Sequence, residues 1–190
     1  TTIRQRVQCE GIGLHSGKTV KLALRPAAED TGIVFHVATA AGSRVITASP
    51  EVVIATGLAT TLGKDGVSVS TVEHLLAALR GLEIDNVHID VSGKEIPILD
   101  GSAAPFVDLI AKAGVLVQSK PRKVFRFARP VSLVQSEKSI KAEPYNGFRV
   151  EYTIDFPHPA IGRQHRMLEL TPASFSQVAR ARTFGFLKDV

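Results

Sequence analysis

The stretch Ser70-Thr-Val-Glu-His-Leu-Leu-Ala-Ala-Leu-Arg80 decides the fold, because it contains the clearest helical pattern in the chain. Its apolar side chains recur at the i, i+3, i+4, i+7 spacing of one buried helix face. They are Val72, Leu75, Leu76 and Leu79. Ser70 followed by Glu73 has the pattern of a capping box, and Gly81 stands where a left-handed C-cap residue is expected. The spacing therefore predicts a helix over residues 70–80.

Strands and a second helix are predicted on both sides of that helix. Alternating apolar residues indicate short strands. They cover residues 18–25, 32–37, 52–54, 67–69 and 85–91. Ser102 begins and Gly114 ends a second predicted helix. Its buried face carries Phe106, Leu109, Ile110 and Ala113. Strands combined with helices in this order predict an α+β fold.

The remaining chain repeats this order. A basic, proline-containing stretch at residues 119–123 is typical of a linker. After it we predict further strands and one helix. They cover residues 124–127, 131–135, 139–142, 148–156, 166–170 and, for the helix, 173–181. Strands followed by helix thus occur twice, over residues 1–118 and 124–190, which predicts two related α+β units with the second incomplete.

Composition excludes several classes of protein. Hydrophobic residues make up 44% and charged residues 22% of the 190 residues, so wholesale disorder is excluded. The apolar runs are far shorter than the ~20 residues of a membrane helix, and the first residues do not have the pattern of a secretory signal. Cys9 is the only cysteine, which excludes a disulfide framework and a multi-cysteine zinc site. A cytoplasmic location fits these features.

The net charge of +5 favours anionic partners. Basic side chains cluster in the second half of the chain. They include Arg122, Lys123, Arg126, Arg163, Arg166, Arg180 and Arg182. One hypothesis is therefore a non-catalytic α+β module that binds RNA or another polyanion, with binding that weakens steeply in salt. A solvated basic surface explains the same residues.

Glu73 and His74 form the candidate site that residue types alone suggest. Imidazole is a common zinc ligand, and a neighbouring carboxylate can take a proton from an activated water. Adjacent helix positions point about 100° apart, so both groups could flank one metal ion. The structural alternative stays open, because Glu73 also completes the capping box. His88 and Asp90 share a strand face and could chelate a metal, but we favour an exposed polar face, because Val87, Ile89 and Val91 take the core side of this strand.

Several strings in this sequence resemble the zinc-dependent UDP-3-O-acyl-N-acetylglucosamine deacetylases of lipid A biosynthesis in Gram-negative bacteria. They occupy residues 11–17, 70–75, 96–106, 144–148, 154–159 and 181–186. They occur in the family's order and span almost the whole chain. The resemblance implies hydrolysis of the acetamido group of an acylated UDP-N-acetylglucosamine, with release of acetate. It also implies two-layer units of the ribosomal-S5-domain-2 type that pack through their helices.

The resemblance assigns roles to individual residues. It makes His74 a zinc ligand and Glu73 the general base that deprotonates the zinc-bound water. Thr183 resembles the threonine that supports the oxyanion of the tetrahedral intermediate. Substrate contacts fall on Leu58 and Ala59 near the metal, Phe184 at the sugar, Phe186 at the acyl passage, and Lys138, Asp155 and Phe156 at the nucleotide. Plain structural roles for Phe156, Phe186 and Lys138 remain an alternative.

The chain also departs from the family pattern. The resemblance places two further zinc ligands and a catalytic histidine beyond the position of Val190. We therefore expect an N-terminal fragment whose partners are the missing C-terminal part of the same protein and the acylated UDP-sugar. We expect no nucleic-acid partner and at most peripheral membrane contact. As a separate polypeptide it should hold zinc poorly and turn over slowly or not at all.

Overall fold

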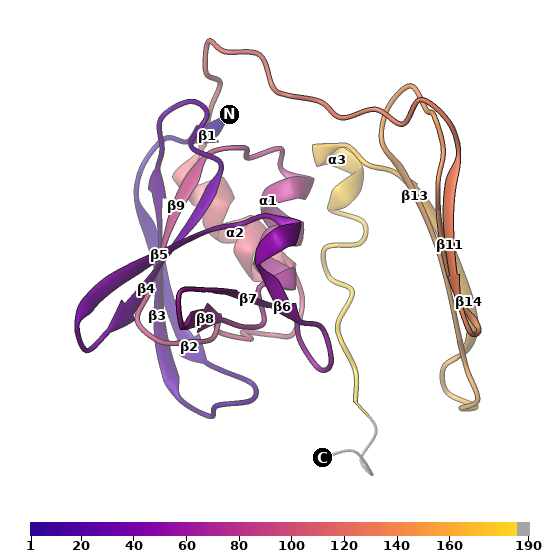
Figure 1. Cartoon of the computed structure of the whole chain (residues 1–190), viewed down its shortest axis with the longest axis horizontal. Helices are drawn as coiled ribbons and strands as arrows, with labels where there is room; N and C mark the ends of the chain where they lie inside the picture. Colours follow the sequence, from indigo (N-terminus) through magenta and orange to yellow (C-terminus); the bar gives the residue numbers. More distant parts are fainter. Residues whose placement is uncertain (186–190) are drawn as a thin grey trace.

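The computed structural model describes residues 1–185 and has the predicted α+β class. A five-stranded sheet runs in the order β2-β3-β9-β4-β5, and helices α1 (Glu73–Gly81) and α2 (Ala104–Ala113) cover one of its faces (Figure 1). The strands are β2 (Val7–Ile12), β3 (Thr19–Pro26), β9 (Val87–Val91), β4 (Ile33–Thr39) and β5 (Gly42–Thr47). Neighbouring strands are antiparallel except β4 and β9, which are parallel.

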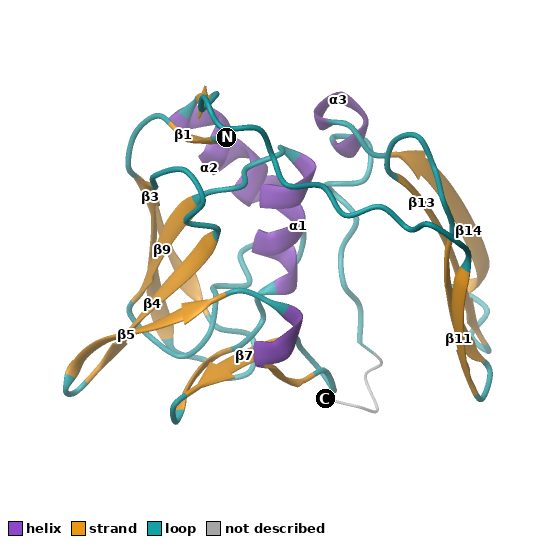
Figure 2. Ribbon diagram, turned by 45° about the horizontal axis from the view of Figure 1, so that its top comes forward, coloured by secondary structure: helices purple, strands orange, loops and turns teal. Residues whose placement is uncertain are grey.

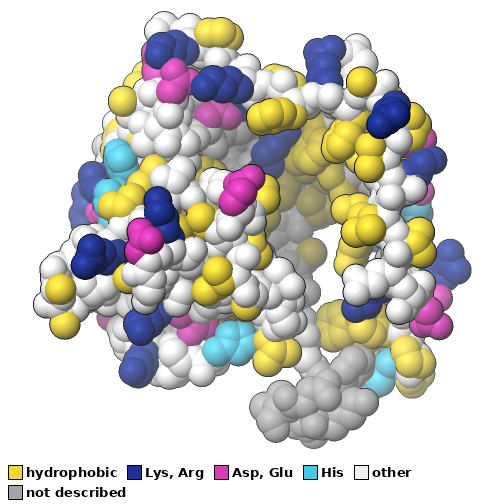
Figure 3. Space-filling model, in the orientation of Figure 1, with side chains coloured by type: hydrophobic (Ala, Val, Ile, Leu, Met, Phe, Trp, Pro, Cys, Tyr) yellow, Lys and Arg dark blue, Asp and Glu magenta, His cyan; other side chains and the backbone are white. Residues whose placement is uncertain are grey.

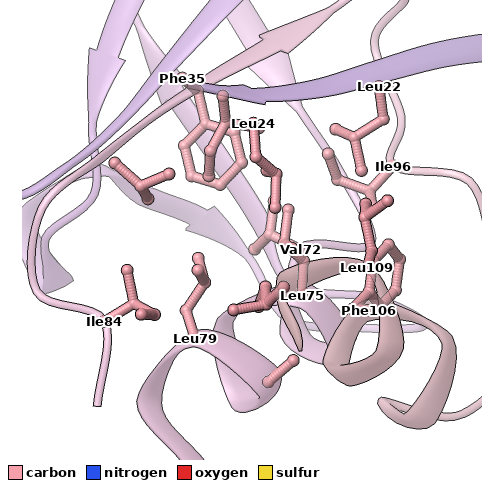
Figure 4. Close-up of a cluster of buried hydrophobic side chains, with 14 of the residues drawn as sticks. Leu22, Leu24, Phe35, Val72, Leu75, Leu79, Ile84, Ile96, Phe106 and Leu109 are labelled. Carbon is pink, nitrogen blue, oxygen red and sulfur yellow. The ribbon is translucent and has the colours of Figure 1, made fainter. Parts of the chain in front are cut away.

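The main core lies between this sheet and the two helices (Figure 4). Alternating residues of the strands point inward, as predicted, and Leu24, Phe35 and Ile89 are fully buried. The predicted faces of both helices, including Leu75 and Phe106, meet them there. Burying one such side chain contributes about 1.5–3 kcal/mol to stability, so these alternating and helical patterns account for the position of the sheet and helices.

Smaller elements connect this core to the start of α1. A short helix η1 (Pro50–Val52) leads into a three-stranded sheet of β6 (Val53–Ala55), β7 (Thr61–Lys64) and β8 (Val67–Val69). Asp65 and Gly66 form the hairpin turn between β7 and β8, with φ angles of 50° and 77°. Positive φ at both central residues suits the twist of a tight hairpin. β1 (Thr2–Ile3) pairs with β10 (Val115–Leu116).

The second half of the chain forms two hairpins and a short helix. β11 (Val131–Gln135) pairs with β12 (Lys138–Ala142), and β13 (Arg149–Phe156) pairs with β14 (Gly162–Glu169). Helix α3 (Pro172–Phe175) follows. Helices α1 and α2 lie between the five-stranded sheet and these hairpins in both ribbon views (Figures 1 and 2). Among residues 1–185, no helix has the length and hydropathy needed to cross a bilayer.

The predicted start of α1 is wrong. The helix begins at Glu73 rather than residue 70, and no side chain caps it. Ser70 pairs instead with the segment before α2: its amide donates to the Lys94 carbonyl over 2.9 Å, and its carbonyl accepts from Ile96 over 3.0 Å. Thr71 then turns the chain with a φ of 58°. Long-range pairing therefore replaces the predicted capping box.

Three further predictions of local structure are corrected. Gly81 is the last residue of α1 and not a left-handed cap; a Cβ there would overlap the Phe175 ring, so close packing explains this glycine. Residues 124–127 form no strand. The helix predicted over 173–181 is α3 followed by turns, in which Val178 and Ala179 both donate to the Phe175 carbonyl. Gly114, by contrast, ends α2 as predicted, and its φ is 69°.

Candidate active site

Glu73 and His74 lie in the first turn of α1, and both side chains are half-buried. The Glu73 carboxylate accepts a hydrogen bond from the backbone N–H of Thr60 over 3.0 Å at Oε2. The Thr60 carbonyl accepts in turn from the amide of Val72 over 3.4 Å. These contacts join the start of α1 to the loop before β7. The Glu73 carboxylate also lies at the positive end of the helix dipole.

Leu58 and Ala59 lie in that same loop, directly before Thr60. Leu58 is 89% exposed, whereas Ala59 is half-buried. The hydrogen bond from Thr60 to Glu73 therefore brings the two predicted substrate contacts close to the predicted base. The exposed Leu58 side chain, in the loop that bonds to Glu73, provides apolar surface that a ligand can cover.

Thr183 belongs to the segment after α3, which runs between α1 and the hairpins (Figures 1 and 2). Its amide donates to the Gly101 carbonyl over 3.1 Å, and Arg182 lies 3.7 Å from the Asp100 carboxylate. The hydrogen bond from the Ser102 hydroxyl lowers the pKa of that Asp100 carboxyl. Among the described residues 1–185, Thr183 makes no hydrogen bond to Glu73 or His74, so no such bond joins the predicted catalytic groups.

The predicted sugar and nucleotide contacts also lie partly together. The rings of Phe156, at the end of β13, and Phe184 meet edge to face with their centroids 5.1 Å apart. Asp155 precedes Phe156 on β13, whereas Lys138 begins β12 in the other hairpin; both are exposed. Phe186 lies outside the described residues.

The donor set for a metal ion is incomplete in the described part of the chain. Residues 1–185 contain no group of three or more histidine, cysteine, aspartate or glutamate side chains that could hold a metal. Catalytic zinc takes about three protein ligands and keeps one open position. The half-buried imidazole of His74 fits one of these ligand positions. His88 and Asp90, which could chelate a metal together, have other partners.

On the outer face of the five-stranded sheet, His88 Nδ1 lies 3.0 Å from His36 Nε2. Asp90 accepts two hydrogen bonds from the Arg25 guanidinium, over 2.7 and 2.9 Å. This Arg25 contact is the main cause that lowers the pKa of the Asp90 carboxyl. His88 and Asp90 thus face different partners, which favours the interpretation as a polar sheet face.

One buried carboxylate was not singled out by the sequence. Glu95 is 3% exposed and accepts hydrogen bonds from the amides of His15 and Ser16 and from the Thr71 hydroxyl. Burial alone would raise the pKa of Glu95, but these hydrogen bonds hold it below its usual value. Beside Lys94 and Ser92, Glu95 reads as part of an ordinary polar turn. Only the fold shows that donors from two distant segments converge on it.

Comparison with known proteins agrees with the resemblance inferred from the motifs. The model of the UDP-3-O-acyl N-acetylglycosamine deacetylase family matches residues 1–190. A UDP-3-O-acyl-N-acetylglucosamine deacetylase of Nitratidesulfovibrio vulgaris is 63% identical over 190 residues, which are all of this chain and 62% of that protein. Proteins of the same name from Oleidesulfovibrio alaskensis and Lawsonia intracellularis are 60% and 50% identical, again over all of this chain and 63% and 62% of their own lengths.

These matches place the chain in a class of deacetylases. More closely, the chain belongs to the UDP-3-O-acyl N-acetylglycosamine deacetylase family. It spans about 62% of the length of the curated relatives that it matches.

Proposed function

We propose that this chain is the N-terminal part of a zinc-dependent deacetylase that removes the N-acetyl group of UDP-3-O-acyl-N-acetylglucosamine in lipid A biosynthesis, releasing acetate. The observation that carries the proposal is the family match over residues 1–190, together with 63% identity to a relative of that name. The Glu73–His74 pair at the start of α1 supports it, because it supplies a carboxylate and an imidazole side by side. A cytoplasmic location is part of the same proposal.

In this proposal Glu73 is the general base. Its carboxylate is oriented by the Thr60 amide and lies at the positive end of the helix dipole. A positioned base of this kind contributes about 10²–10⁴-fold to a rate. His74 is one zinc ligand; zinc, when bound, polarises the amide carbonyl and makes water a nucleophile near neutral pH.

Other residues of this chain would hold the substrate and the developing charge. The Thr183 hydroxyl donates to the oxyanion, and its backbone is already fixed by the Gly101 carbonyl. Phe184, with its ring against Phe156, forms an apolar surface for the sugar and the nucleobase of the substrate. Further substrate contacts are assigned to Leu58 and Ala59 near the metal, Lys138 and Asp155 at the nucleotide, and Phe186 at the acyl chain.

The proposal includes two related units, residues 1–118 and 124–190, joined by residues 119–123, with the second unit incomplete. Exposed apolar side chains on the hairpins support this. Leu133 and Ile140 stand opposite each other in the β11–β12 register and are 65% and 69% exposed. Hydrophobic side chains gather along the hairpins in Figure 3. Large exposed apolar patches mark surfaces that another element covers, and we assign that role, and the other zinc ligands, to the rest of the protein.

The rival hypothesis is a module that binds a polyanion. Ion pairs already engage part of its basic cluster: Arg122 lies 2.7 Å from Asp85, and Lys123 lies 3.9 Å from Asp30. Arg182 pairs with Asp100. Positive charge that is neutralised within the chain contributes little to phosphate binding, and this favours the deacetylase.

Replacement of Glu73 in the complete protein tests the proposal. Glu73→Ala should lower acetate release by about 10²–10⁴-fold, because the base is lost, while circular dichroism and thermal unfolding stay close to those of the parent. Asp108→Ala is the matched control, since Asp108 is an exposed carboxylate on α2. Unchanged acetate release in Glu73→Ala would refute the proposal, as would a parent protein that releases no acetate from the UDP-sugar in the presence of zinc.

A further inference from the structure

Glu95 is a buried carboxylate at which two distant segments meet. Its Oε1 accepts from the His15 amide over 2.9 Å and from the Thr71 hydroxyl over 3.2 Å. Its Oε2 accepts from the Ser16 amide over 3.0 Å. Since the residue is only 3% exposed, its carboxylate is largely withdrawn from water. A buried carboxylate is tolerated only where such donors replace its hydration, so the three donors and the carboxylate depend on one another.

The Thr71 turn controls the direction in which α1 starts. Thr71 is 2% exposed and has a φ of 58°, a conformation that is strained for a β-branched residue. Two hydrogen bonds that Ser70 makes to Lys94 and Ile96 hold the preceding residue. The hydroxyl contact with Glu95 holds Thr71 itself. Glu73 and His74 follow immediately, so their orientation depends on this turn.

The same carboxylate fixes the loop at residues 13–17, which belongs to one of the strings that resemble the family. The loop closes on itself through the bond from the Gly17 amide to the Gly13 carbonyl. A Cβ at Gly13 would overlap the Glu95 carboxylate, so only glycine allows this close approach. None of the roles assigned above involves this loop. Through Glu95, this loop is connected by hydrogen bonds to Thr71, just before the start of α1.

We propose that Glu95 is a positioning residue of the active site: it locks the Thr71 turn, and thereby sets Glu73 and His74, while it ties the loop at residues 13–17 to the same point. The inference rests on the proposed function, because it gives Glu73 and His74 a task that depends on orientation. Glu95 itself does not touch the substrate, since its oxygens face protein donors and it is buried. Displacing a reacting group by about 1 Å can cost 10²-fold in rate.

The test uses Glu95→Gln in the complete protein. The amide keeps the size of the side chain but brings an N–H group against the donors of His15, Ser16 or Thr71. We expect kcat to fall about 10–100-fold with KM changed less than about 3-fold, the size of effect known for residues that orient catalytic ligands. Asp90→Asn is the matched control, because it breaks a carboxylate contact on the opposite face of the sheet and should leave kcat unchanged.

Non-additivity separates positioning from a purely structural effect. If Glu95 acts through Glu73, then Glu95→Gln should cost less than about 3-fold when Glu73 is already alanine. In hydrogen exchange, the peptide that contains the Thr60 amide should exchange faster in Glu95→Gln, while a β13 peptide stays unchanged. An equal loss of kcat in both backgrounds, or unchanged exchange at Thr60, would overturn the inference.

Thr71 supplies a second route if Glu95→Gln does not fold. Thr71→Val removes the hydroxyl and keeps the β-branched shape, whereas Thr71→Ser keeps the hydroxyl. We expect the loss of kcat and the faster Thr60 exchange in the valine variant only; equal behaviour of the two variants would overturn the inference. The Thr60 exchange readout needs no catalysis. Unchanged turnover in Glu73→Ala would therefore refute the proposed function, while faster exchange would still support the role of Glu95.

Discussion

The amide of Thr60 donates to Glu73 Oε2 over 3.0 Å. The sequence pattern predicts that Glu73 forms a capping box with Ser70, but its carboxylate bonds instead to a loop outside its own helix. The same loop carries Leu58 and Ala59. A base that is hydrogen-bonded to its neighbouring loop moves with that loop. This contact therefore couples the two predicted substrate contacts to the orientation of the group that would take the proton.

The role of the Thr183 hydroxyl can be tested without disturbing the backbone, because the hydrogen bond that holds this residue is made by its amide. Its amide bonds to the Gly101 carbonyl, and a valine side chain leaves that bond in place. In the complete protein, Thr183→Val should lower kcat by about 10²–10³-fold, the loss typical of one oxyanion donor. Thr183→Ser keeps the hydroxyl and should retain most activity. Steady-state acetate release measures both variants, and equal kcat values would contradict the assignment.

The close packing of Gly81 against Phe175 predicts an unusual glycine effect. In an exposed helix, Gly→Ala stabilises by about 1 kcal/mol. Here the added methyl group meets the Phe175 ring, so Gly81→Ala should lower the free energy of unfolding by about 1–3 kcal/mol, the cost of overpacking a core. Urea unfolding of the complete protein measures the change. In a Phe175→Leu background the cost should shrink, and an equal cost in both backgrounds would show that α3 is not responsible.

Local patterns predicted the elements whose stability is decided locally. The apolar spacing of Leu75 and Leu79 fixed the face of α1, and the alternation through Ile89 fixed that of β9. The glycine at the end of α2 also followed from local backbone geometry. These features depend on neighbours within a few residues, which a sequence displays directly.

Long-range contacts account for what the patterns missed. Before α1, Thr71 bonds to Glu95 and Ser70 pairs with Lys94 and Ile96, while Gly81 packs against Phe175. None of these partners lies nearby in the sequence. Of the candidate site, residue types alone suggest Glu73 and His74 as a pair, with a structural role as the alternative, and their assigned roles come from the family resemblance. Thr183 and Leu58 followed only from the family motifs, because a hydroxyl or an apolar side chain in a loop has no distinctive pattern of its own.

A measurement of RNA binding distinguishes the polyanion-binding module from the deacetylase. Because acidic neighbours pair with Arg122, Lys123 and Arg182, the complete protein should bind a labelled single-stranded RNA only non-specifically, with a Kd of about 10⁻⁴–10⁻⁶ M at physiological salt. Fluorescence anisotropy at several salt concentrations measures this. Arg163→Ala with Arg166→Ala should leave acetate release unchanged. Binding at nanomolar RNA, lost in that double variant, would favour the polyanion module.

The lowered pKa of His36 predicts a dependence of stability on pH. Burial, and next the neighbouring His88, lower the pKa of His36; Arg25 acts in the same direction and Asp90 opposes it. The unfolded chain has an ordinary histidine pKa of about 6.5. Between the folded and unfolded pKa values, the unfolded chain binds more protons, so the free energy of unfolding rises with pH. Stability should therefore be lost as the pH falls below about 6.5.

His36→Gln tests this dependence. Glutamine can still hydrogen-bond to His88 but does not titrate, so the slope of unfolding free energy between pH 7 and pH 5 should flatten relative to the parent. Urea unfolding of the complete protein at several pH values provides the measurement. His15→Gln serves as control, because His15 is exposed and is not part of the His36–His88 contact. A His36→Gln protein that keeps the parent slope would contradict a lowered His36 pKa, since the proton uptake on unfolding must then come from another group.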